Sequence, residues 1–536
     1  MNELFVRTED IEEKEILNFF VESPKDRAII EQLKSRTPIV LIGGRGVGKS
    51  FLMKVAKVEL SNDFSKDRIL PVYISFIKSS LIATHDKGDF LYWMLAKICT
   101  GIVRQLKRSG SVVGTSRSLD LLAGGQMDER SPTLIEEICS RFENLWRNQE
   151  KINIEGIPSV EDVKNAVEDI CEENDIKRIV LFIDEAAHIF IREQQAEFFT
   201  LFRDLRCPKI SCKAAVYPGV TAYGDNFQYS QDATFINLNR FVTDSGYAET
   251  MREMVTKQIE NDSSYLKELS RKGQEFTDLT YAASGNPRFL LNNIKTLNKF
   301  AANEINQIIK NFYRVTLLAE HSALSEKYPK LEMLIDWGRK FVEDHVLSEM
   351  QKRNQEAIGV GKSTMCHFWI HKDSPEPVKR ALSLLEYTGI VQIHTKGLRA
   401  SGGEVGTRYM VNLGCLFAIE ANPLNVSHSI IKNLDVRRYL EFSANSPAYN
   451  DIKDSKQTIT DNDLSESLEQ QLNKDVKVLN ISDFLKTKLH EIKLNTIKDV
   501  LSATEEDIKK AYYVGTKRSR ILKNAALTSI YEYLIG

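Results

Sequence analysis

The stretch Pro38-Ile39-Val40-Leu41-Ile42-Gly43-Gly44-Arg45-Gly46-Val47-Gly48-Lys49-Ser50 predicts the fold of the first half of the chain. Its apolar run, 39–42, is typical of a buried parallel strand. The run leads directly into Gly43-x-x-x-x-Gly48-Lys49-Ser50, the phosphate-loop pattern. Helical spacing of apolar residues follows over 51–60. A chance match is the alternative, and the order of strand, glycine loop and helix argues against it.

The glycines of this loop point to phosphate chemistry. They open backbone conformations that other residues avoid, so that main-chain N–H groups can turn inward around an anion. The helix that follows presents its free N–H groups and positive dipole end to the same anion. We expect Lys49 to reach the β- and γ-phosphates of ATP and Ser50 to ligate Mg²⁺. The predicted nucleotide-binding residues are Gly43, Gly44, Arg45, Gly46, Val47, Gly48, Lys49, Ser50 and Phe51.

A second motif, Arg178-Ile-Val-Leu-Phe-Ile-Asp184-Glu185, supplies acidic residues. Its apolar run predicts a buried strand, and ligands of open α/β sheets bind at the carboxyl ends of such strands. Asp184 is expected to hold the Mg²⁺, directly or through water, and Glu185 to activate the attacking water as general base. The alternative is an acidic strand end that caps a helix. His188 is expected to be a structural or surface histidine.

The composition is that of a soluble globular protein with roughly three to four domains. Hydrophobic residues make up 42% and charged residues 27% of the 536-residue chain. The net charge of −2 excludes a wholly basic nucleic-acid binder and allows a local basic patch. The scattered cysteines lack metal-ligand spacing and favour a reducing, cytoplasmic setting. We see no signal peptide and no membrane-spanning stretch, so we expect no membrane partner.

The remaining patterns up to residue 245 predict an α/β fold. Strands are expected at 68–76, 209–216 and 233–238, and helices at 24–33, 90–107, 133–148 and 159–174. The Ser/Gly-rich residues 108–132 read as a loop. Together with the two motifs, these elements fit the doubly wound parallel sheet of a P-loop NTPase.

A third motif, Ser284-Gly285-Asn286-Pro287-Arg288, opens a predicted helix at 289–302. A phosphate loop, an Asp-Glu strand end and a later Gly-Asn-Pro-Arg together resemble the AAA+ ATPases, and most closely their origin-recognition/initiator (ORC-type) clade and its bacterial relatives. The resemblance implies a helical lid whose "sensor 2" arginine, here Arg288, contacts the γ-phosphate. The implied catalytic residues are Lys49, Glu185 and Arg288.

The chain departs from the ORC-type pattern at two places. "Sensor 1", a small polar residue at the end of the fourth strand, falls at Tyr217-Pro218, with Thr221 shortly after. The trans-acting arginine finger normally precedes the fifth strand, yet 222–234 contains no arginine. The substitutes, which the sequence leaves unranked, are Arg203, Arg206 and Arg240.

The segment 331–440 is interpreted as a winged helix, which in the ORC-type family follows the ATPase and binds DNA. A compact helix at 376–387 is the candidate recognition helix, and 396–406 is the candidate wing, carrying Lys396 and Arg399. The alternative is a winged helix used for protein contacts or internal packing. Near it, Gly359-Val-Gly361-Lys362-Ser363-Thr364 looks like half a phosphate loop, but Glu356 stands where the first glycine belongs. We expect that stretch to be a loop opening a helix.

The C-terminal residues form a further predicted module. Residues 441–475, rich in Ser, Asn and Asp, read as a linker, and 476–536 as a small all-α domain. Within it, 513–520 joins two helices and resembles the helix-hairpin-helix of DNA-binding tails. Backbone N–H groups there, with Lys517, Arg518 and Arg520, are expected to grip DNA phosphates without reading sequence. The alternative is a helical protein-docking module.

The predicted division is a P-loop ATPase core at 1–245, a helical lid at 246–330, a winged-helix domain at 331–440, a linker at 441–475 and a helix-hairpin-helix-like domain at 476–536. This division favours a Mg²⁺-dependent ATPase switch that couples its nucleotide state to the binding of double-stranded DNA. The alternative is a bacterial signalling or anti-phage defence ATPase whose C-terminal modules dock a protein effector. The expected protein partner is a second copy of the chain, in a homo-oligomer, or a protein effector. A GTPase is disfavoured because no Asn-Lys-x-Asp motif occurs, and a small-molecule kinase by Glu185 and the extra domains.

Overall fold

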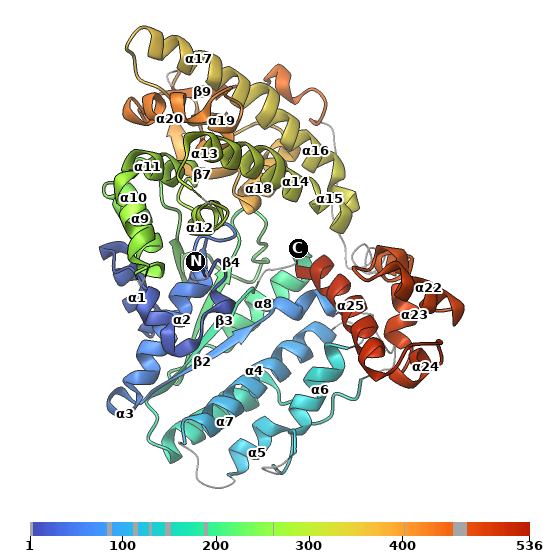
Figure 1. Cartoon of the computed structure of the whole chain (residues 1–536). Helices are drawn as coiled ribbons and strands as arrows, with labels where there is room; N and C mark the ends of the chain where they lie inside the picture. The colour runs from blue at the N-terminus through green and yellow to red at the C-terminus, as the bar shows by residue number, and fades with distance from the viewer. Residues whose placement is uncertain are drawn as a thin grey trace.

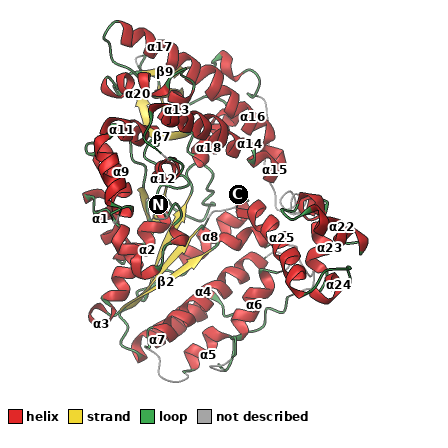
Figure 2. Ribbon diagram, viewed as in Figure 1, coloured by secondary structure: helices red, strands yellow, loops and turns green. Residues whose placement is uncertain are grey.

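The computed structural model joins an α/β core to a second, smaller sheet and a helical C-terminal module (Figure 1; Figure 2). Within the described residues, no helix combines the length and the apolar character that crossing a bilayer would require. The structure describes residues 4–82, 88–110, 116–127, 131–144, 152–186, 191–260, 262–297, 299–400, 402–453 and 469–535.

The first sheet is parallel throughout, with strand order β2-β3-β4-β1-β5. This order places β1 between β4 and β5, and so brings the carboxyl ends of β1, β3 and β4 to one edge, where the glycine loop and the acidic pair lie. It confirms the doubly wound sheet predicted from the sequence. The strands are β1 Ile39–Ile42, β2 Ile69–Ser75, β3 Arg178–Asp184, β4 Ile210–Val216 and β5 Thr234–Asn237.

Helices cover both faces of this sheet because successive strand residues point to opposite sides. Val40 packs into one buried cluster, with α4, α7 and α8, whereas Leu41 packs into another, with α1 and α2. Ser23 caps α1 by accepting the N–H of Asp26 at 3.0 Å, as the Ser-Pro start predicted. The helices are α1 Pro24–Lys34, α2 Lys49–Asn62, α4 Asp89–Arg108, α7 Val160–Glu173 and α8 Arg192–Asp204.

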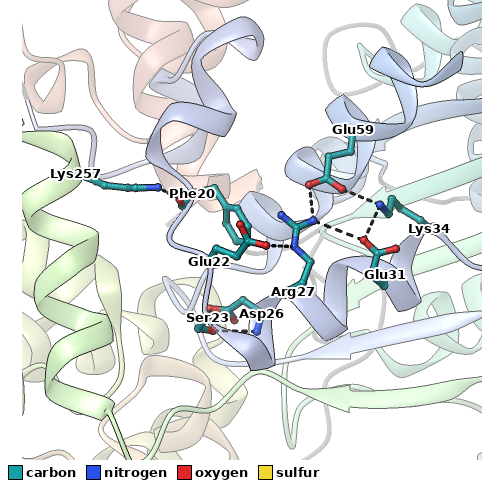
Figure 3. Close-up of polar contacts among 9 residues, drawn as sticks. All are labelled: Phe20, Glu22, Ser23, Asp26, Arg27, Glu31, Lys34, Glu59 and Lys257. Atoms are coloured by element: carbon teal, nitrogen blue, oxygen red, sulfur yellow. Dashed lines mark hydrogen bonds and ion pairs between the residues drawn. The ribbon is translucent and has the colours of Figure 1, made fainter.

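Charged contacts hold α1 against α2, the helix that follows the glycine loop (Figure 3). Arg27 and Lys34 of α1 donate to the two carboxylate oxygens of Glu59 at 2.7 and 2.9 Å. Lys257, far along the chain, donates to the carbonyl of Phe20 (Figure 3). These contacts fix the N-terminal segment against both the core and the lid.

The expectation of a loop throughout 108–132 is wrong. A helix, α5 Arg117–Ala123, forms there because Ser116 accepts the N–H of Leu119 at its start and Gly124 takes a left-handed conformation at its end. Leu119 and Leu122 of this helix are buried. The following helix, α6 Leu134–Phe142, ends sooner than the 133–148 expected from its pattern.

The lid is a set of short helices after β5. The helix that begins at the Gly-Asn-Pro-Arg motif ends at Lys295, so the expected span to 302 is wrong; a new helix begins at Ala302. The bounds are α9 Tyr247–Gln258, α10 Ser263–Arg271, α11 Gly273–Ala282, α12 Pro287–Lys295, α13 Ala302–Ile309, α14 Leu317–Ser322 and α15 Leu324–Lys327, with a π-helical segment, Lys310–Thr316, between α13 and α14.

The winged-helix domain has a sheet with strand order β7-β8-β6-β9. The sequence predicted the helix and the hairpin but missed β6 and β9, which flank them. The expected wing at 396–406 is also wrong in extent, because β7 runs on to Arg399 and β8 begins at Val405. The bounds are α16 Glu332–Lys340, α17 Ser348–Gly359, β6 His367–His371, α18 Glu376–Thr388, β7 Val391–Arg399, β8 Val405–Val411, α19 Leu413–Ala418, α20 Pro423–Lys432 and β9 Tyr439–Phe442.

The lid and the winged-helix domain share one hydrophobic core. Met251 of α9, Leu290 of α12 and Leu385 of α18 belong to the same buried cluster. Tyr449 and Ile452 are buried in it as well, although 441–475 was expected to be a linker. The chain between β9 and residue 453 is therefore packed against the winged-helix domain.

The C-terminal module consists of helices joined by short loops and has its own core (Figure 2). Two capping boxes, Thr496 with Asp499 and Thr504 with Asp507, start consecutive helices as the sequence predicted. Leu472 is buried in this core, so the module begins inside the expected linker. The helices are α22 Asp483–Glu491, α23 Ile497–Ser502, α24 Glu505–Lys509 and α25 Thr516–Ile535.

Candidate nucleotide site

The glycine loop joins the end of β1 to the start of α2 and needs its glycines. Gly46 and Gly48 have φ of 80° and 102°, in the left-handed region that residues with a side chain avoid. A Cβ added to Gly43 would lie 2.5 Å from Cγ2 of Val47, which is only 2% exposed. The loop is therefore folded tightly back on itself at the N-terminus of α2, where main-chain N–H groups and the helix dipole favour an anion.

Lys49 lies inside this loop. Its Nζ donates to the carbonyls of Gly43 and Gly44 at 2.7 and 2.9 Å, and sits 4.1 Å from the centroid of the Tyr217 ring. Burial lowers the pKa of Lys49 to about 8, although the carboxylates of Glu185 and Asp184 oppose that shift. A buried ammonium held by two carbonyls can exchange them for phosphate oxygens, which bind it more strongly.

Asp184 ends β3 next to α2 and accepts hydrogen bonds from Ser50 and from the hydroxyl of Tyr73. Tyr73 comes from β2, the neighbouring strand. Burial raises the pKa of Asp184, and the carboxylate of Glu185 raises it further. The Ser50 and Asp184 oxygens are adjacent hard donors, the kind that Mg²⁺ prefers, so this pair fits the metal predicted for it.

Glu185 follows Asp184 with a φ of 56°, a left-handed conformation that is unusual for a residue with a side chain. Its Oε2 accepts a hydrogen bond of 2.7 Å from the hydroxyl of Tyr217, the residue directly after β4. The other sensor 1 candidate, Thr221, donates its hydroxyl to the carbonyl of Tyr217 at 2.6 Å. At the sensor 1 position, a tyrosine hydroxyl therefore donates a hydrogen bond to the expected general base, whereas the hydroxyl of Thr221 donates to a backbone carbonyl.

The lid reaches the loop through the start of α12. Asn286 caps this helix by accepting the N–H of Arg288 at 3.1 Å, and its Nδ2 donates to the carbonyl of Arg45 at 2.7 Å. A Cβ on Gly46 would lie 2.6 Å from Cβ of Arg288. The Nε of Arg288 is buried and has no hydrogen-bond partner among the described residues. Burial lowers the pKa of Arg288, and the Arg45 cation lowers it further.

The loop thus gathers three cations, the buried Lys49 and the partly buried Arg45 and Arg288. The charges of Arg45 and Arg288 lower the pKa of Lys49, and the charge of Arg45 lowers the pKa of Arg288. An anionic group bound on the loop would relieve this repulsion and could accept a hydrogen bond from the unpartnered Nε of Arg288. The residues present therefore fit the phosphates of a nucleotide. Of the predicted loop residues, Phe51 lies within α2 and is half-buried.

The substitutes for the arginine finger have different surroundings. Arg240 is buried, pairs with Asp26 at 2.8 Å and donates to the carbonyl of Val47 at 2.9 Å, so it supports the loop from within. Arg203 donates to the carbonyl of Asn226 at 2.7 Å. Arg206 is exposed. His188 falls outside the described residues.

Sequence patterns missed two residues that contact the site: Tyr73 of β2, and Tyr387 of α18, whose ring lies 5.5 Å from the Arg45 guanidinium carbon. Two others were expected in different roles: Arg240, a substitute for the arginine finger, supports the loop, and Tyr217, at the sensor 1 position, is the partner of Glu185. Strand order could have pointed to Tyr73, because β2 neighbours β3. No local spacing could have found Tyr387.

The residues predicted for DNA lie in two exposed places. Lys396 and Arg399 are exposed on β7, on the strand itself rather than in a loop. Lys517, Arg518 and Arg520 are exposed in the first turns of α25, directly after Gly515. Arg518 donates to the carbonyl of Tyr513 at 2.6 Å, so part of its donor capacity closes the hairpin. The candidate recognition helix, α18, packs instead against the glycine loop, where a Cβ on Gly44 would lie 3.4 Å from the Glu386 carbonyl.

Two solved structures of low similarity align over much of the chain. The structure of the Aeropyrum pernix ORC1 protein in complex with DNA is 11% identical, with a TM-score of 0.34, over 77% of this chain and 94% of that one. The Aeropyrum pernix ORC2 protein, in its ADPNP-ADP complexes, is 11% identical, with a TM-score of 0.36, over 77% and 97%. Sequence identities and TM-scores this low support no inference about function. No curated protein sequence matches the chain.

A family comparison gives a more specific result. Residues 5–83 match the ORC-CDC6-like family. This segment holds β1, the glycine loop, α2 and β2, including Lys49, Ser50 and Tyr73. The match confirms, for the part of the chain that holds the glycine loop, the resemblance to the ORC-type AAA+ ATPases that its motifs indicated.

Proposed function

We propose that the chain binds and hydrolyses ATP at the glycine loop as an AAA+ ATPase. The observation that carries the proposal is the convergence of Lys49, Arg45 and Arg288 on a loop whose left-handed glycines open it to an anion. Buried like charges destabilise a fold unless a counter-charge completes the site. A triphosphate is such a counter-charge. The similarity of residues 5–83 to the ORC-CDC6-like family supports the same reading.

Each residue has a defined role in this proposal. Lys49 binds the β- and γ-phosphates, Arg288 contacts the γ-phosphate from the lid, and main-chain N–H groups of 43–51 surround the phosphates. Ser50 and Asp184 would hold Mg²⁺, which neutralises charge on the phosphates when bound. Glu185 accepts the proton of the attacking water.

We propose further that nucleotide state controls DNA binding by the C-terminal modules. The exposed cations of α25 stand at a helix N-terminus, where phosphates bind through backbone N–H groups as well as charge. Lys396 and Arg399 provide a second exposed basic site on β7. The division of the chain into five parts, with boundaries at 245, 330, 440 and 475, belongs to this proposal, and part of the expected linker packs on its neighbours. We also propose that the chain forms a homo-oligomer.

An electrophoretic mobility shift with double-stranded DNA at low salt, with and without ATP, tests the coupling. We expect retardation that depends on ATP and that Lys517→Glu weakens. Lys477→Glu is the matched control, since it makes the same charge change on the same module at an exposed site outside α25. Absence of DNA affinity in either nucleotide state would remove the coupling and leave the ATPase.

A further inference from the structure

The helix expected to read DNA, α18, covers the nucleotide site instead. It approaches two loops at the carboxyl edge of the sheet, and both contacts depend on a glycine. A Cβ on Gly44 would lie 3.4 Å from the Glu386 carbonyl, and one on Gly219 would lie 2.6 Å from Cβ of Ser383. Gly219 follows Tyr217 by two residues, so α18 reaches both the loop after β1 and the loop after β4.

A continuous set of contacts leads from α18 to the general base. Tyr387 of α18 meets the ring of Tyr217 edge-on, with centroids 4.9 Å apart. The hydroxyl of Tyr217 donates to Oε2 of Glu185 at 2.7 Å. The Lys49 ammonium lies 4.1 Å from the Tyr217 centroid. Since Tyr217 and Tyr387 are 3% and 4% exposed, neither ring can turn away while α18 stays in place.

This arrangement keeps Glu185 from acting as a base. Its Oε2 is engaged by the hydroxyl of Tyr217, and Tyr217 occupies the side from which a water would approach that oxygen. A base must lie within hydrogen-bond reach of the water it activates. The Lys49 ammonium lies against the Tyr217 ring and also donates a hydrogen bond to the carbonyl of Gly43 in its own loop. Phosphates that draw Lys49 away remove one of the two groups that hold Tyr217, and movement of α18 removes the other.

We propose that α18 of the winged-helix domain is a wall of the nucleotide site and restrains hydrolysis, with Tyr387 as a positioning residue that holds Tyr217 on Glu185. The proposal rests on the ATPase function proposed above. A displacement of the winged-helix domain, such as a DNA or protein partner would impose, releases the general base.

Two substitutions release the restraint at different points. Tyr217→Phe removes the hydroxyl that engages Glu185 and keeps the ring. Gly219→Ala puts a Cβ where Ser383 stands and so forces α18 away from the loop. Gly246→Ala is the matched control: Gly246 has a φ of 73°, against 71° at Gly219, and its added Cβ meets no atom within 4 Å. Both alanines carry the same backbone strain, and only one displaces α18.

ATP affinity is measured first by calorimetry, and then kcat and KM are measured in steady state. We expect Tyr217→Phe and Gly219→Ala to raise kcat about tenfold, the order of one hydrogen bond to a charged group, and Gly246→Ala to match the wild type. In Tyr217→Phe the increase should appear in kcat and not in KM, because the phenylalanine keeps the ring and lacks only the hydroxyl that engages Glu185.

A wild type that does not bind ATP refutes the proposed function itself. If the wild type binds ATP and both variants turn over at or below its rate, the restraint alone is refuted, and Tyr217 then orients Glu185 productively. A rate increase shared by Gly246→Ala would assign the effect to backbone strain and also refute the role of α18.

Discussion

The chain contains the pentapeptide Gly-Val-Gly-Lys-Ser twice, at 46–50 and at 359–363. The first copy begins α2, and the second ends α17, so that the expectation of a helix opening after 359–364 is wrong. In the first, Val47 is 2% exposed; in the second, Val360 is 68% exposed. Identical residues therefore form a buried loop at the proposed nucleotide site in one place and a surface turn in the other.

The two copies use their N–H groups in opposite ways. At the second, the N–H groups of Gly361 and Lys362 donate to the carbonyls of Ile358 and Ala357 at 3.2 and 2.8 Å. They satisfy the last carbonyls of a helix, at the end where its dipole is negative and repels anions. At the first copy the N–H groups stand at a helix start, where the dipole attracts anions. The position of the helix relative to the glycines decides the chemistry.

The largest difference between the copies should appear when each lysine is truncated. Lys49→Ala removes a buried cation from the loop, and we expect ATP affinity to fall by about 1,000-fold, as for other buried charge partners. Lys362→Ala removes the exposed lysine of the same pentapeptide, and affinity should stay unchanged. Titration calorimetry measures both. Equal losses in the two variants would contradict the assignment of the site to 43–51.

Glu185→Gln should separate binding from turnover at the first copy. The amide keeps the size of the side chain but cannot take a proton from water, so kcat should fall at least about 100-fold. ATP affinity should change little, because the phosphates bind to the loop and to Lys49. Phosphate release and calorimetry on one preparation provide the two values. An unchanged kcat would exclude Glu185 as the general base.

The third prediction concerns the pH dependence of stability. A buried carboxyl group, that of Glu386 in α18, lies near the first copy. Burial raises the pKa of Glu386 from 4.5 to about 7. The folded chain then keeps a proton that the unfolded chain has lost, so stability falls as the pH rises from about 4.5 to about 7 and the penalty stays constant above that. Glu386→Gln should abolish this loss, which is at most about 3 kcal/mol.

Thermal unfolding at about pH 5 and about pH 8 checks this prediction, with Glu356→Gln as control. Glu356 is an exposed glutamate three residues before the second copy. The stabilisation by Glu386→Gln should be larger at the higher pH, whereas Glu356→Gln should shift neither midpoint. A shift of equal size at both pH values would show that packing, not the buried charge, causes the effect.

The smallest predicted difference is between two alanine substitutions at left-handed glycines. Gly46 and Gly361 have φ of 80° and 67°, so Gly46→Ala and Gly361→Ala should each lower the stability of the fold by roughly 1 kcal/mol through backbone strain. Only Gly46→Ala also clashes with Arg288 and Asn286 of the lid, and we expect it alone to weaken ATP binding, by about tenfold. If Gly361→Ala weakened ATP binding equally, the lid contact would have no part in the effect.

Much of the core could be predicted from local patterns. The apolar run before the glycine loop became β1, and the acidic pair became the end of β3, because a buried strand needs a continuous apolar run and its carboxyl end is exposed to ligands. The helix α5 was missed because its four apolar residues, in a segment rich in Ser and Gly, span too few turns for a helical period to be detected. The strands β6 and β9 were missed because each is paired with residues far along the chain.

The sequence by itself determined the phosphate loop, the acidic strand end and the Arg288 turn, since each needs only neighbouring residues in one order. Only the tertiary structure decided what surrounds them. Tyr217 meets Glu185 across two strand ends, and Tyr387 arrives from a helix more than 300 residues beyond the loop. Such contacts depend on strand order and on how α18 packs, and no spacing along the chain encodes either, because side chains far apart in sequence meet only when the whole fold is closed.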